Sequence, residues 1–342
     1  MVLDGLTLTL EDVERVALDL SVRVRLSDEA AERMVASRNF IEELVETGEP
    51  VYGVTTGFGR LADVAVAPDE REALQRNLVR SHASGVGSPM DRASVRALML
   101  LRANALARGN SGCRVLVVEQ LLQLLNAGIH PRVPEFGSVG ASGDLAPLAH
   151  VALGLLGEGL AEYSGDEQSV ETAMATEGIA PLTLGSKEGL ALINGTQATT
   201  GLGLLALRAA ERAVEVAEVA GAMSLEALLG TPEPFRKEIH EARPHKGQGI
   251  SASRLRTLLA DSEIRASHQE DDPRVQDAYS LRCMPQVHGA AREALGYVRG
   301  ILEVEANSAT DNPLVFPSAE VVVSGGNFHA QIVAQALDLL TI

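Results

Sequence analysis

Residues 137–150, Gly-Ser-Val-Gly-Ala-Ser-Gly-Asp-Leu-Ala-Pro-Leu-Ala-His, contain the part of the sequence with the clearest potential for chemistry. Ala141, Ser142 and Gly143 restrain the backbone little, so the amide nitrogen of Gly143 can approach the carbonyl carbon of Ala141. Attack at that carbon, with loss of one water from the new ring carbon and one from the Ser142 side chain, gives a five-membered imidazolone with an exocyclic methylidene. The tripeptide therefore predicts an electrophile that is made from the chain itself.

A second interpretation of the same residues needs no chemistry. Glycine-rich turns before helices commonly cap the helix or bind an anion, and Asp144 is a suitable N-cap for an apolar helix that begins there. The tripeptide alone favours this simpler interpretation. The choice between the two depends on the rest of the sequence.

Several further blocks surround this segment in a fixed order, and together they span residues 52–329. The set resembles the aromatic amino acid ammonia-lyases, whose prosthetic group is methylidene-imidazolone (MIO), and it most resembles their histidine ammonia-lyase branch. That many matches in register favour the electrophile. The blocks lie at residues 52–59, 81–87, 102–112, 137–150, 187–197, 275–283 and 325–329.

The resemblance implies a catalytic group for each difficulty of ammonia elimination. The β-proton of an amino acid is barely acidic and an amine is a poor leaving group, so the reaction needs a base and an electrophile. The resemblance assigns the base to Tyr52, the electrophile to an MIO formed from Ala141-Ser142-Gly143, and support of MIO formation and of the amine to Tyr279. A phenol that acts as a base near neutrality needs a neighbour that stabilises the phenolate.

The substrate-binding residues also follow from the resemblance. Arg282 is assigned to the substrate carboxylate, which its planar fork suits, although an isolated arginine is more often part of a structural ion pair. Asn194 and Gln276 are assigned to polar contacts with MIO and substrate, and Phe328 to the pocket wall. Tyr279 and Arg282 are one helical turn apart and are expected on one face.

His82 decides the branch of the family. The pair Ser81-His82 is similar to the histidine-specific lyases, so His82 is predicted to contact a substrate imidazole. Thr55 departs from the asparagine that histidine lyases often have there. The resemblance thus implies conversion of L-histidine to trans-urocanate and ammonia, with a tyrosine or phenylalanine ammonia-lyase or aminomutase as the alternative.

The elements that must position these residues are helical. Aromatic residues make up only 3% of the chain, and the long apolar stretches follow helical rather than alternating spacing. We predict a mainly α, lyase-type fold in which an MIO-bearing domain at 1–185 packs on a bundle of long helices at 186–342. The expected helices are 27–48, 68–79, 91–108, 113–127, 144–158, 190–229 and 285–306.

The long helix expected at 190–229 bears on the oligomeric state. Its charges form one polar stripe on an otherwise apolar rod, which one chain of this size can hardly cover. A homo-oligomer is therefore expected, and the resemblance implies a homotetramer whose active sites combine three subunits. The chain stops at Ile342 without a capping residue and the family continues beyond that length to a glutamate that binds the histidine side chain. A truncated chain, or a catalytically incomplete helical scaffold, is therefore a further expectation.

Composition excludes some partners. A formal net charge of −17 argues against nucleic acid and anionic membranes, and no run of about 18 uncharged apolar residues is present to span a bilayer. Cys113 and Cys283 form no disulfide framework or metal motif, and no signal peptide is visible, so a cytoplasmic protein with an amino acid substrate is expected. His240 and His245 fit no helical pair of metal ligands, and no metal site is predicted.

Overall fold

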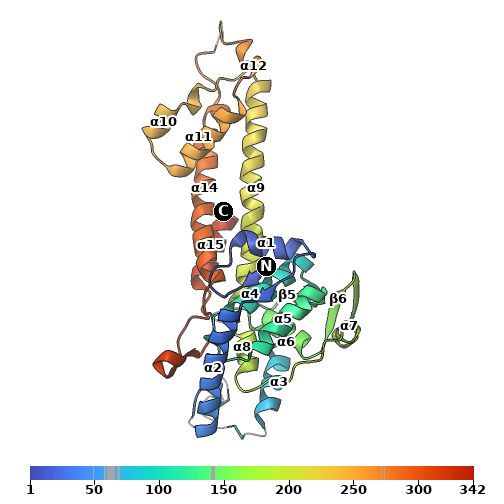
Figure 1. Ribbon diagram of the computed structural model, residues 1–342. Helices are drawn as coiled ribbons and strands as arrows, with labels where there is room; N and C mark the ends of the chain where they lie inside the picture. Colours follow the sequence, from blue (N-terminus) through green and yellow to red (C-terminus); the bar gives the residue numbers. More distant parts are fainter. Residues whose placement is uncertain are drawn as a thin grey trace. The chain divides into compact units, whose positions relative to one another are not determined.

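The computed structural model describes residues 1–342 except Glu49, Phe58, 60–65, 68–69, 140–142, Asp271 and Pro273. The described residues form two compact units (Figure 1). Unit 1 comprises Met1–Leu205 and Ile301–Gln335, and unit 2 comprises Ala206–Gly300 and Ala336–Ile342. The domain boundary that we expected at residue 185 stays a prediction.

Unit 1 is built mainly from helices, as predicted. Two of them begin and end as their sequences require: Thr9 and Ser27 are N-caps whose side chains accept the backbone N–H of Asp12 and Ala30, and Gly48 ends the second helix in the left-handed region. The helices that lie within this unit are α1 (Leu10–Leu18), α2 (Asp28–Thr47), α3 (Arg71–His82), α4 (Arg92–Ala107), α5 (Val115–Ala127), α6 (Leu145–Leu155), α7 (Val170–Thr176) and α8 (Glu188–Ile193).

The core of unit 1 centres on α4, which packs against α1 and α5. Every residue of α4 from Ser94 to Ala107 is buried, which fits a helix that is apolar on most of its surface. Its two interior arginines are paired with backbone carbonyls: Arg96 Nε lies 2.8 Å from the oxygen of Val16, and Arg102 donates to the oxygen of Ala191. These bonds satisfy part of each guanidinium, while Arg96 Nη2 and Arg102 Nε have no hydrogen-bond partner among the described residues.

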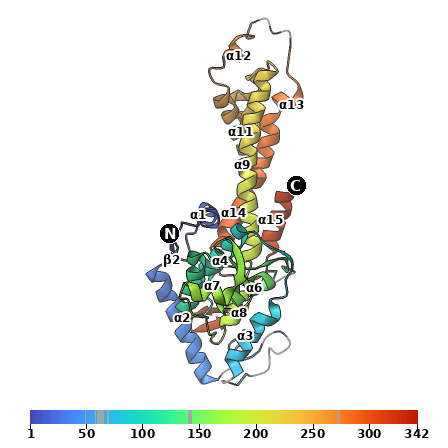
Figure 2. The same ribbon diagram turned by 90° about the vertical axis from the view of Figure 1, so that its right-hand side faces the viewer.

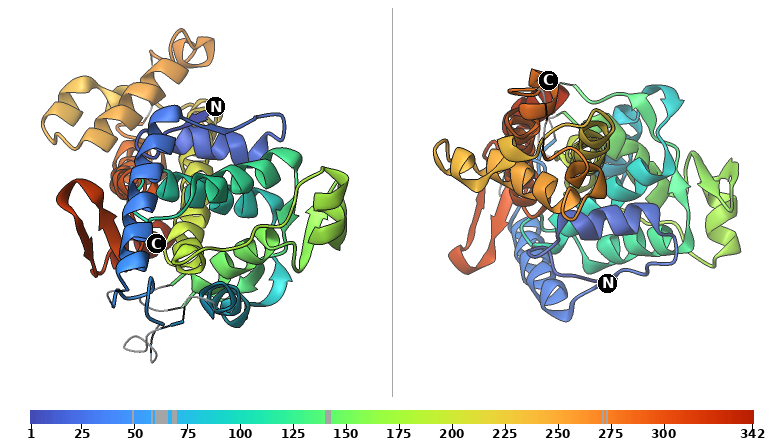
Figure 3. Two further views of the ribbon diagram at one scale, coloured as in Figure 1. Left: turned by 60° about the horizontal axis from the view of Figure 1, so that its bottom comes forward. Right: turned by 90° about the horizontal axis from the view of Figure 1, so that it is seen from above.

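Short paired strands connect the loops of unit 1. Pairing of β3 with β5 is antiparallel and brings the segment after His82 beside the segment that leads into residue 137. The β6–β7 hairpin lies at the edge of the unit in both views of Figure 3. The strands are β1 (Val2–Leu3), β2 (Arg25–Leu26), β3 (Val86–Pro89), β4 (His130–Pro131), β5 (Pro134–Phe136), β6 (Leu160–Tyr163), β7 (Asp166–Ser169), β8 (Leu314–Phe316) and β9 (Val321–Val323), and a 3-10 helix, η4 (Pro317–Ala319), joins the last two.

The helix expected at 190–229 is interrupted. The structure has α8 and then α9 (Gln197–Ala227), with Asn194 in an extended conformation between them. Asn194 and Gly195 are weak helix formers, and the Asn194 side chain bonds to residues outside the helix instead of continuing it. The apolar stretch at Glu188–Ala227 is long and apolar enough to cross a membrane, but 78% of its apolar window is buried, as in a core helix of a soluble protein.

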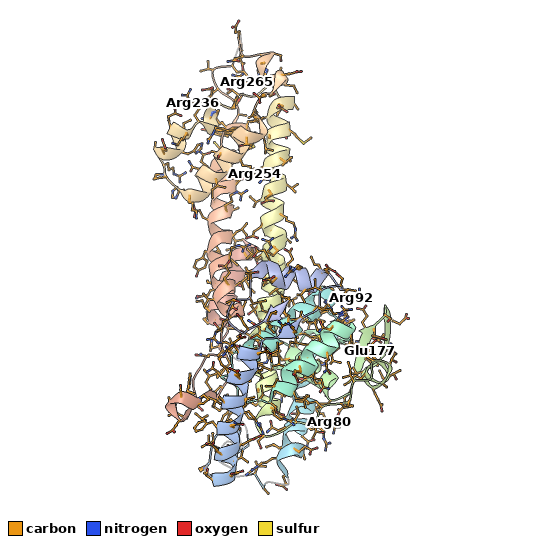
Figure 4. The ribbon with its side chains drawn as sticks, viewed as in Figure 1. Arg80, Arg92, Glu177, Arg236, Arg254 and Arg265 are labelled. Carbon is orange, nitrogen blue, oxygen red and sulfur yellow. The ribbon has the colours of Figure 1, made fainter. Side chains whose placement is uncertain are left out.

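In unit 2, the second part of α9 lies alongside α14 (Met284–Ala306), as Figures 1 and 2 show. Two ion pairs join them, from Arg292 to Glu218 at 2.6 Å and from Arg299 to Glu211 at 2.8 Å. Arg254 of α11, labelled in Figure 4, also pairs with Glu218, at 3.1 Å. The unit further contains η3 (Glu233–Phe235), α10 (Lys237–Glu241), α11 (Lys246–Leu258), α12 (Glu263–Ala266), α13 (Tyr279–Arg282) and the end of α15 (Gln331–Thr341).

Charged residues of α9 therefore face α14, while several apolar ones face outward. Val216 and Met223 of α9 are 67% and 65% exposed, Leu228 directly after α9 is 60% exposed, and Val287 of α14 is 65% exposed. The predicted apolar rod is thus only partly covered by the chain itself.

Candidate active site

A cavity of about 510 Å³ lies in unit 1 and collects four of the predicted site residues. Tyr52, His82, Asn194 and Phe328 all line it, although they are far apart in the sequence. The described residues that line the cavity are Tyr52, Gly59, Leu74, Asn77, Leu78, Ser81, His82, Leu145, Leu190, Ile193, Asn194, Asn312 and Phe328. The wall is mostly apolar with a few convergent polar groups, which is the composition of a small-molecule site.

Tyr52 is positioned by a compact turn. The carbonyl oxygen of Val51 accepts the backbone N–H groups of Val54 and Thr55 at 3.0 Å each, and the Val51 N–H donates to Thr55 Oγ1 at 2.8 Å. The phenolic oxygen of Tyr52 accepts the Gly59 N–H at 3.5 Å. Thr55 is buried, and its hydroxyl oxygen stabilises this turn.

His82 ends α3 and has a defined tautomer. Its Nδ1 lies 2.9 Å from the carbonyl oxygen of Leu78, and because a carbonyl can only accept, Nδ1 carries the proton. In the neutral ring, Nε2 is then a hydrogen-bond acceptor. His82 can therefore offer the cavity an acceptor.

Asn194 follows α8 and reaches the cavity from a buried position. Its Nδ2 lies 3.3 Å from Asp311 Oδ1 and 3.3 Å from the carbonyl oxygen of Asn312. These contacts bring the loop after α14 to the cavity wall, where Asn312 itself is a lining residue. The carboxamide is thus held on one edge.

The glycine-rich segment reaches the cavity through its last residues. Ala141 and Ser142 lie outside the described residues, whereas Gly143 is buried and its carbonyl oxygen accepts the Val139 N–H at 2.7 Å. Two residues further on, Leu145 begins α6 and lines the cavity. The predicted tripeptide is therefore joined directly to the cavity wall.

Asp144 has a different role from the predicted helix cap. Its side chain makes no capping bond; instead it accepts the N–H and hydroxyl of Thr199 at 2.8 and 2.7 Å and the Ser138 hydroxyl at 2.8 Å. Burial raises the pKa of the Asp144 carboxyl, and these hydrogen bonds oppose that rise. Through these three bonds, Ser138 before the tripeptide and Asp144 after it are both linked to Thr199 at the start of α9.

Three predicted site residues belong to unit 2. Gln276 is exposed and Tyr279 is 73% exposed, while the Arg282 guanidinium lies over the Tyr279 ring, 4.4 Å from its centroid. Tyr279 and Arg282 therefore do share one face of α13, as their spacing predicted. None of the three is among the described residues that line the cavity.

Sequence comparison decides what kind of protein carries this cavity. A model of the aromatic amino acid lyases matches residues 8–342. The chain belongs to the aromatic amino acid lyase family. Proteins of this family use MIO, and the predicted family and mainly helical lyase fold are confirmed.

The relatives identify the branch. The chain is 51% identical to a histidine ammonia-lyase of Caldanaerobacter subterraneus and 53% identical to one of Anaeromyxobacter dehalogenans, covering 100% of this chain and 67% and 69% of the relatives. It therefore spans about two thirds of the length of these lyases. The structure also matches crystal structures of Trypanosoma cruzi histidine ammonia-lyase, with TM-score 0.90, 43% identity and coverage of 99% and 63%, and of Streptomyces globisporus tyrosine aminomutase, with TM-score 0.92, 41% identity and coverage of 100% and 67%.

Among the aromatic amino acid lyases, MIO comes from the chain, so the local backbone must fit its formation. The loop around the tripeptide is closed by the bond from Val139 to Gly143 and held at Asp144. Gly137 is closely packed, because a Cβ there would lie 3.1 Å from the Cβ of Ala146 and 3.2 Å from the Cα of Gly85. The described residues on both sides of the tripeptide therefore fit a constrained, tightly packed loop.

Sequence reasoning missed two polar residues of the cavity, Asn77 and Asn312. Asn77 precedes Ser81 by four residues on α3, so helical spacing would have placed it beside the Ser81-His82 block. Asn312 lies in a loop whose partner could not be read from local sequence. No group of three metal-ligating side chains is found among the described residues, and His240 bonds instead to Pro234 and Gln248.

Proposed function

We propose that this protein eliminates ammonia from L-histidine to give trans-urocanate, using an MIO formed from Ala141-Ser142-Gly143. The observation that carries the proposal is the cavity that Tyr52, His82 and Leu145 line together. Leu145 lies two residues after Gly143, the last residue of that tripeptide. The identity of just over half of the residues to histidine ammonia-lyases supports the same reaction.

Tyr52 is the base in this proposal. It takes the proton from the β-carbon, the carbon–nitrogen bond breaks as the double bond forms, and ammonia leaves. The Gly59 N–H that points to the phenolic oxygen stabilises negative charge there, and the Val51–Thr55 turn fixes the ring. MIO supplies the electrophile that makes the amine a better leaving group.

The other residues bind and orient the substrate. Nε2 of His82 accepts the imidazole N–H of histidine, Asn194 contacts the polar end of the substrate, and Phe328 closes the apolar wall. We assign Gln276, Tyr279 and Arg282 to a site completed by another subunit, with Arg282 on the substrate carboxylate. The exposure of Gln276 and Tyr279 leaves them available for that role.

Replacement of His82 tests the substrate. His82→Leu removes the acceptor for the imidazole, so kcat/KM for histidine is expected to fall by about tenfold to a hundredfold. Phenylalanine, whose ring has no hydrogen-bond donor, should be relatively favoured, and tyrosine less so because its hydroxyl can also donate. The measurement is kcat/KM for all three amino acids side by side.

Arg80→Leu is the matched control, because Arg80 stands two residues earlier on α3 and pairs with Glu158 at the surface (Figure 4). It should leave the preference unchanged. Equal effects of both variants would show that His82 does not select the substrate. A preference of the unaltered chain for tyrosine would favour the tyrosine lyase or aminomutase alternative. Absence of turnover with all three would favour the incomplete scaffold.

We also propose a homotetramer. The outward apolar residues of α9 and α14, such as Val216 and Val287, form a surface that neighbouring chains can cover. Leu228→Glu, directly after the end of α9, places a charge beside this surface and should yield dissociated or insoluble protein, whereas Glu226→Gln in the last turn of α9 should not. Sedimentation of the unaltered chain as a soluble monomer at micromolar concentration would contradict this proposal.

The location we propose is the cytoplasm. Cys113 and Cys283 are both free, and burial raises the pKa of the Cys113 thiol to about 12. Free thiols are the usual state of cysteine in a reducing compartment. The small, polar substrate of the proposed reaction fits the same location.

A further inference from the structure

A fully buried ion pair lies behind the cavity wall. Lys187 Nζ is 2.7 Å from Asp311 Oδ2, and the two side chains are 0% and 2% exposed. Removing one member of such a pair is strongly destabilising, yet the pair as a whole rarely adds net stability, because both charges must leave water. Its presence beside the cavity therefore calls for an explanation other than stability.

The backbone of Lys187 is also unusual. Its φ is +70°, in the left-handed region that disfavours residues with a side chain, and Lys187 stands at the N-cap of α8. Non-glycine residues are kept in that region when their surroundings fix them, and they are common at functional sites. Here the ion pair with Asp311 fixes the side chain that leaves this strained position.

The second oxygen of Asp311 connects the pair to the cavity. Asp311 Oδ1 accepts from Asn194 Nδ2 at 3.3 Å and from the Asn312 N–H at 2.7 Å. Asn194 and Asn312 both line the cavity, whereas Lys187 and Asp311 do not appear among its described lining residues. One carboxylate is thus bonded to a buried cation on one side and to two wall residues on the other.

We propose that Lys187 and Asp311 are positioning residues that act through Asn194. Lys187 holds the Asp311 carboxylate in one orientation, and Asp311 then fixes which edge of the Asn194 carboxamide faces the cavity. The inference depends on the proposed function, in which Asn194 contacts the substrate. It adds two residues that touch neither substrate nor MIO but set the geometry of one that does.

A double-variant cycle tests the proposal in the full chain. The neutral-pair variant, Lys187→Met with Asp311→Leu, removes both charges and so leaves no unpaired charge in the interior. It is compared with Asn194→Ala and with the triple variant for kcat/KM on histidine, for melting temperature, and for intact mass, which shows whether the ring has formed.

The neutral pair is expected to keep the same mass deficit, relative to its own encoded mass, as the unaltered chain and to lose about tenfold to a hundredfold in kcat/KM, the value of one hydrogen bond to a charged group. The triple variant should lose no more than Asn194→Ala alone, because the pair acts only through that side chain. Should the neutral pair fail to fold, Lys187→Met with Asp311→Asn takes its place in the same cycle, since it also leaves no unpaired charge.

Arg114→Met is the matched control. Arg114 pairs at 2.5 Å with Glu188, the buried residue next to Lys187, and neither is among the described residues that line the cavity. This variant should melt at a lower temperature while kcat/KM stays within about twofold. Loss of kcat/KM in proportion to melting temperature in all variants would indicate a structural role only.

The outcomes separate the two proposals. If Asn194→Ala lowers kcat/KM but the neutral pair adds an independent loss in the triple variant, the positioning role is wrong and the proposed function stands. If Asn194→Ala leaves kcat/KM unchanged, the positioning role and the substrate contact of Asn194 are wrong while the reaction stands. If the unaltered chain does not turn over histidine, the proposed function is wrong.

Discussion

Ser142→Ala is expected to abolish the electrophile and to lower histidine turnover by several orders of magnitude. The unaltered chain should be lighter than its encoded mass by two waters, localised to residues 141–143, because ring closure removes one water at the carbonyl of Ala141 and one at the side chain of Ser142. An alanine at 142 has no hydroxyl to lose, so a methylidene cannot form. Intact mass and peptide mapping are read alongside kcat.

Ser88→Ala is the control for this change, because Ser88 is an exposed serine on β3 with no place in the cavity. It should show the same mass deficit as the unaltered chain. A full encoded mass in unaltered, folded protein, or undiminished turnover by Ser142→Ala, would rule out the MIO.

Tyr52→Phe is expected to lower kcat by about 10²- to 10⁴-fold, the usual contribution of a positioned general base. The ring remains to fill the cavity wall, so substrate affinity and the mass deficit should change little. This pattern separates loss of the base from loss of the electrophile, since Ser142→Ala changes both mass and rate.

Tyr163→Phe provides the comparison for Tyr52. Tyr163 lies on β6, where its hydroxyl donates to Glu177, and it is not among the described cavity residues. Its replacement should leave kcat unchanged. A Tyr52→Phe variant with full kcat, or one that has lost its mass deficit, would remove Tyr52 from the role of base.

Helices and their caps were predictable because their signals are local. Thr9, Ser27 and Gly48 act where their chemistry requires, and the helices at 91–108 and 113–127 appear within two residues of the expected ends. The interruption at Asn194 was missed because its cause is a contact with Asp311, more than a hundred residues away.

The cavity was predictable only in part, for the same reason. Resemblance supplied Tyr52, His82, Asn194 and Phe328, and the structure brings these four together. It could not show that Asp144 would bond to Thr199 rather than cap its own helix, since that choice depends on the start of α9 lying within reach. Contacts distant in sequence decide both cases.

The burial of Lys187 also determines how the protein responds to amine-directed reagents. The chain has three lysines, and Lys187 is fully enclosed, whereas Lys237 and Lys246 are exposed on α10 and at the start of α11. Apart from the amino terminus, acylating dyes, cross-linkers and activated resins therefore find reactive amines only in unit 2. Labelling or immobilisation through lysine would leave the chemistry of the cavity in unit 1 unmodified.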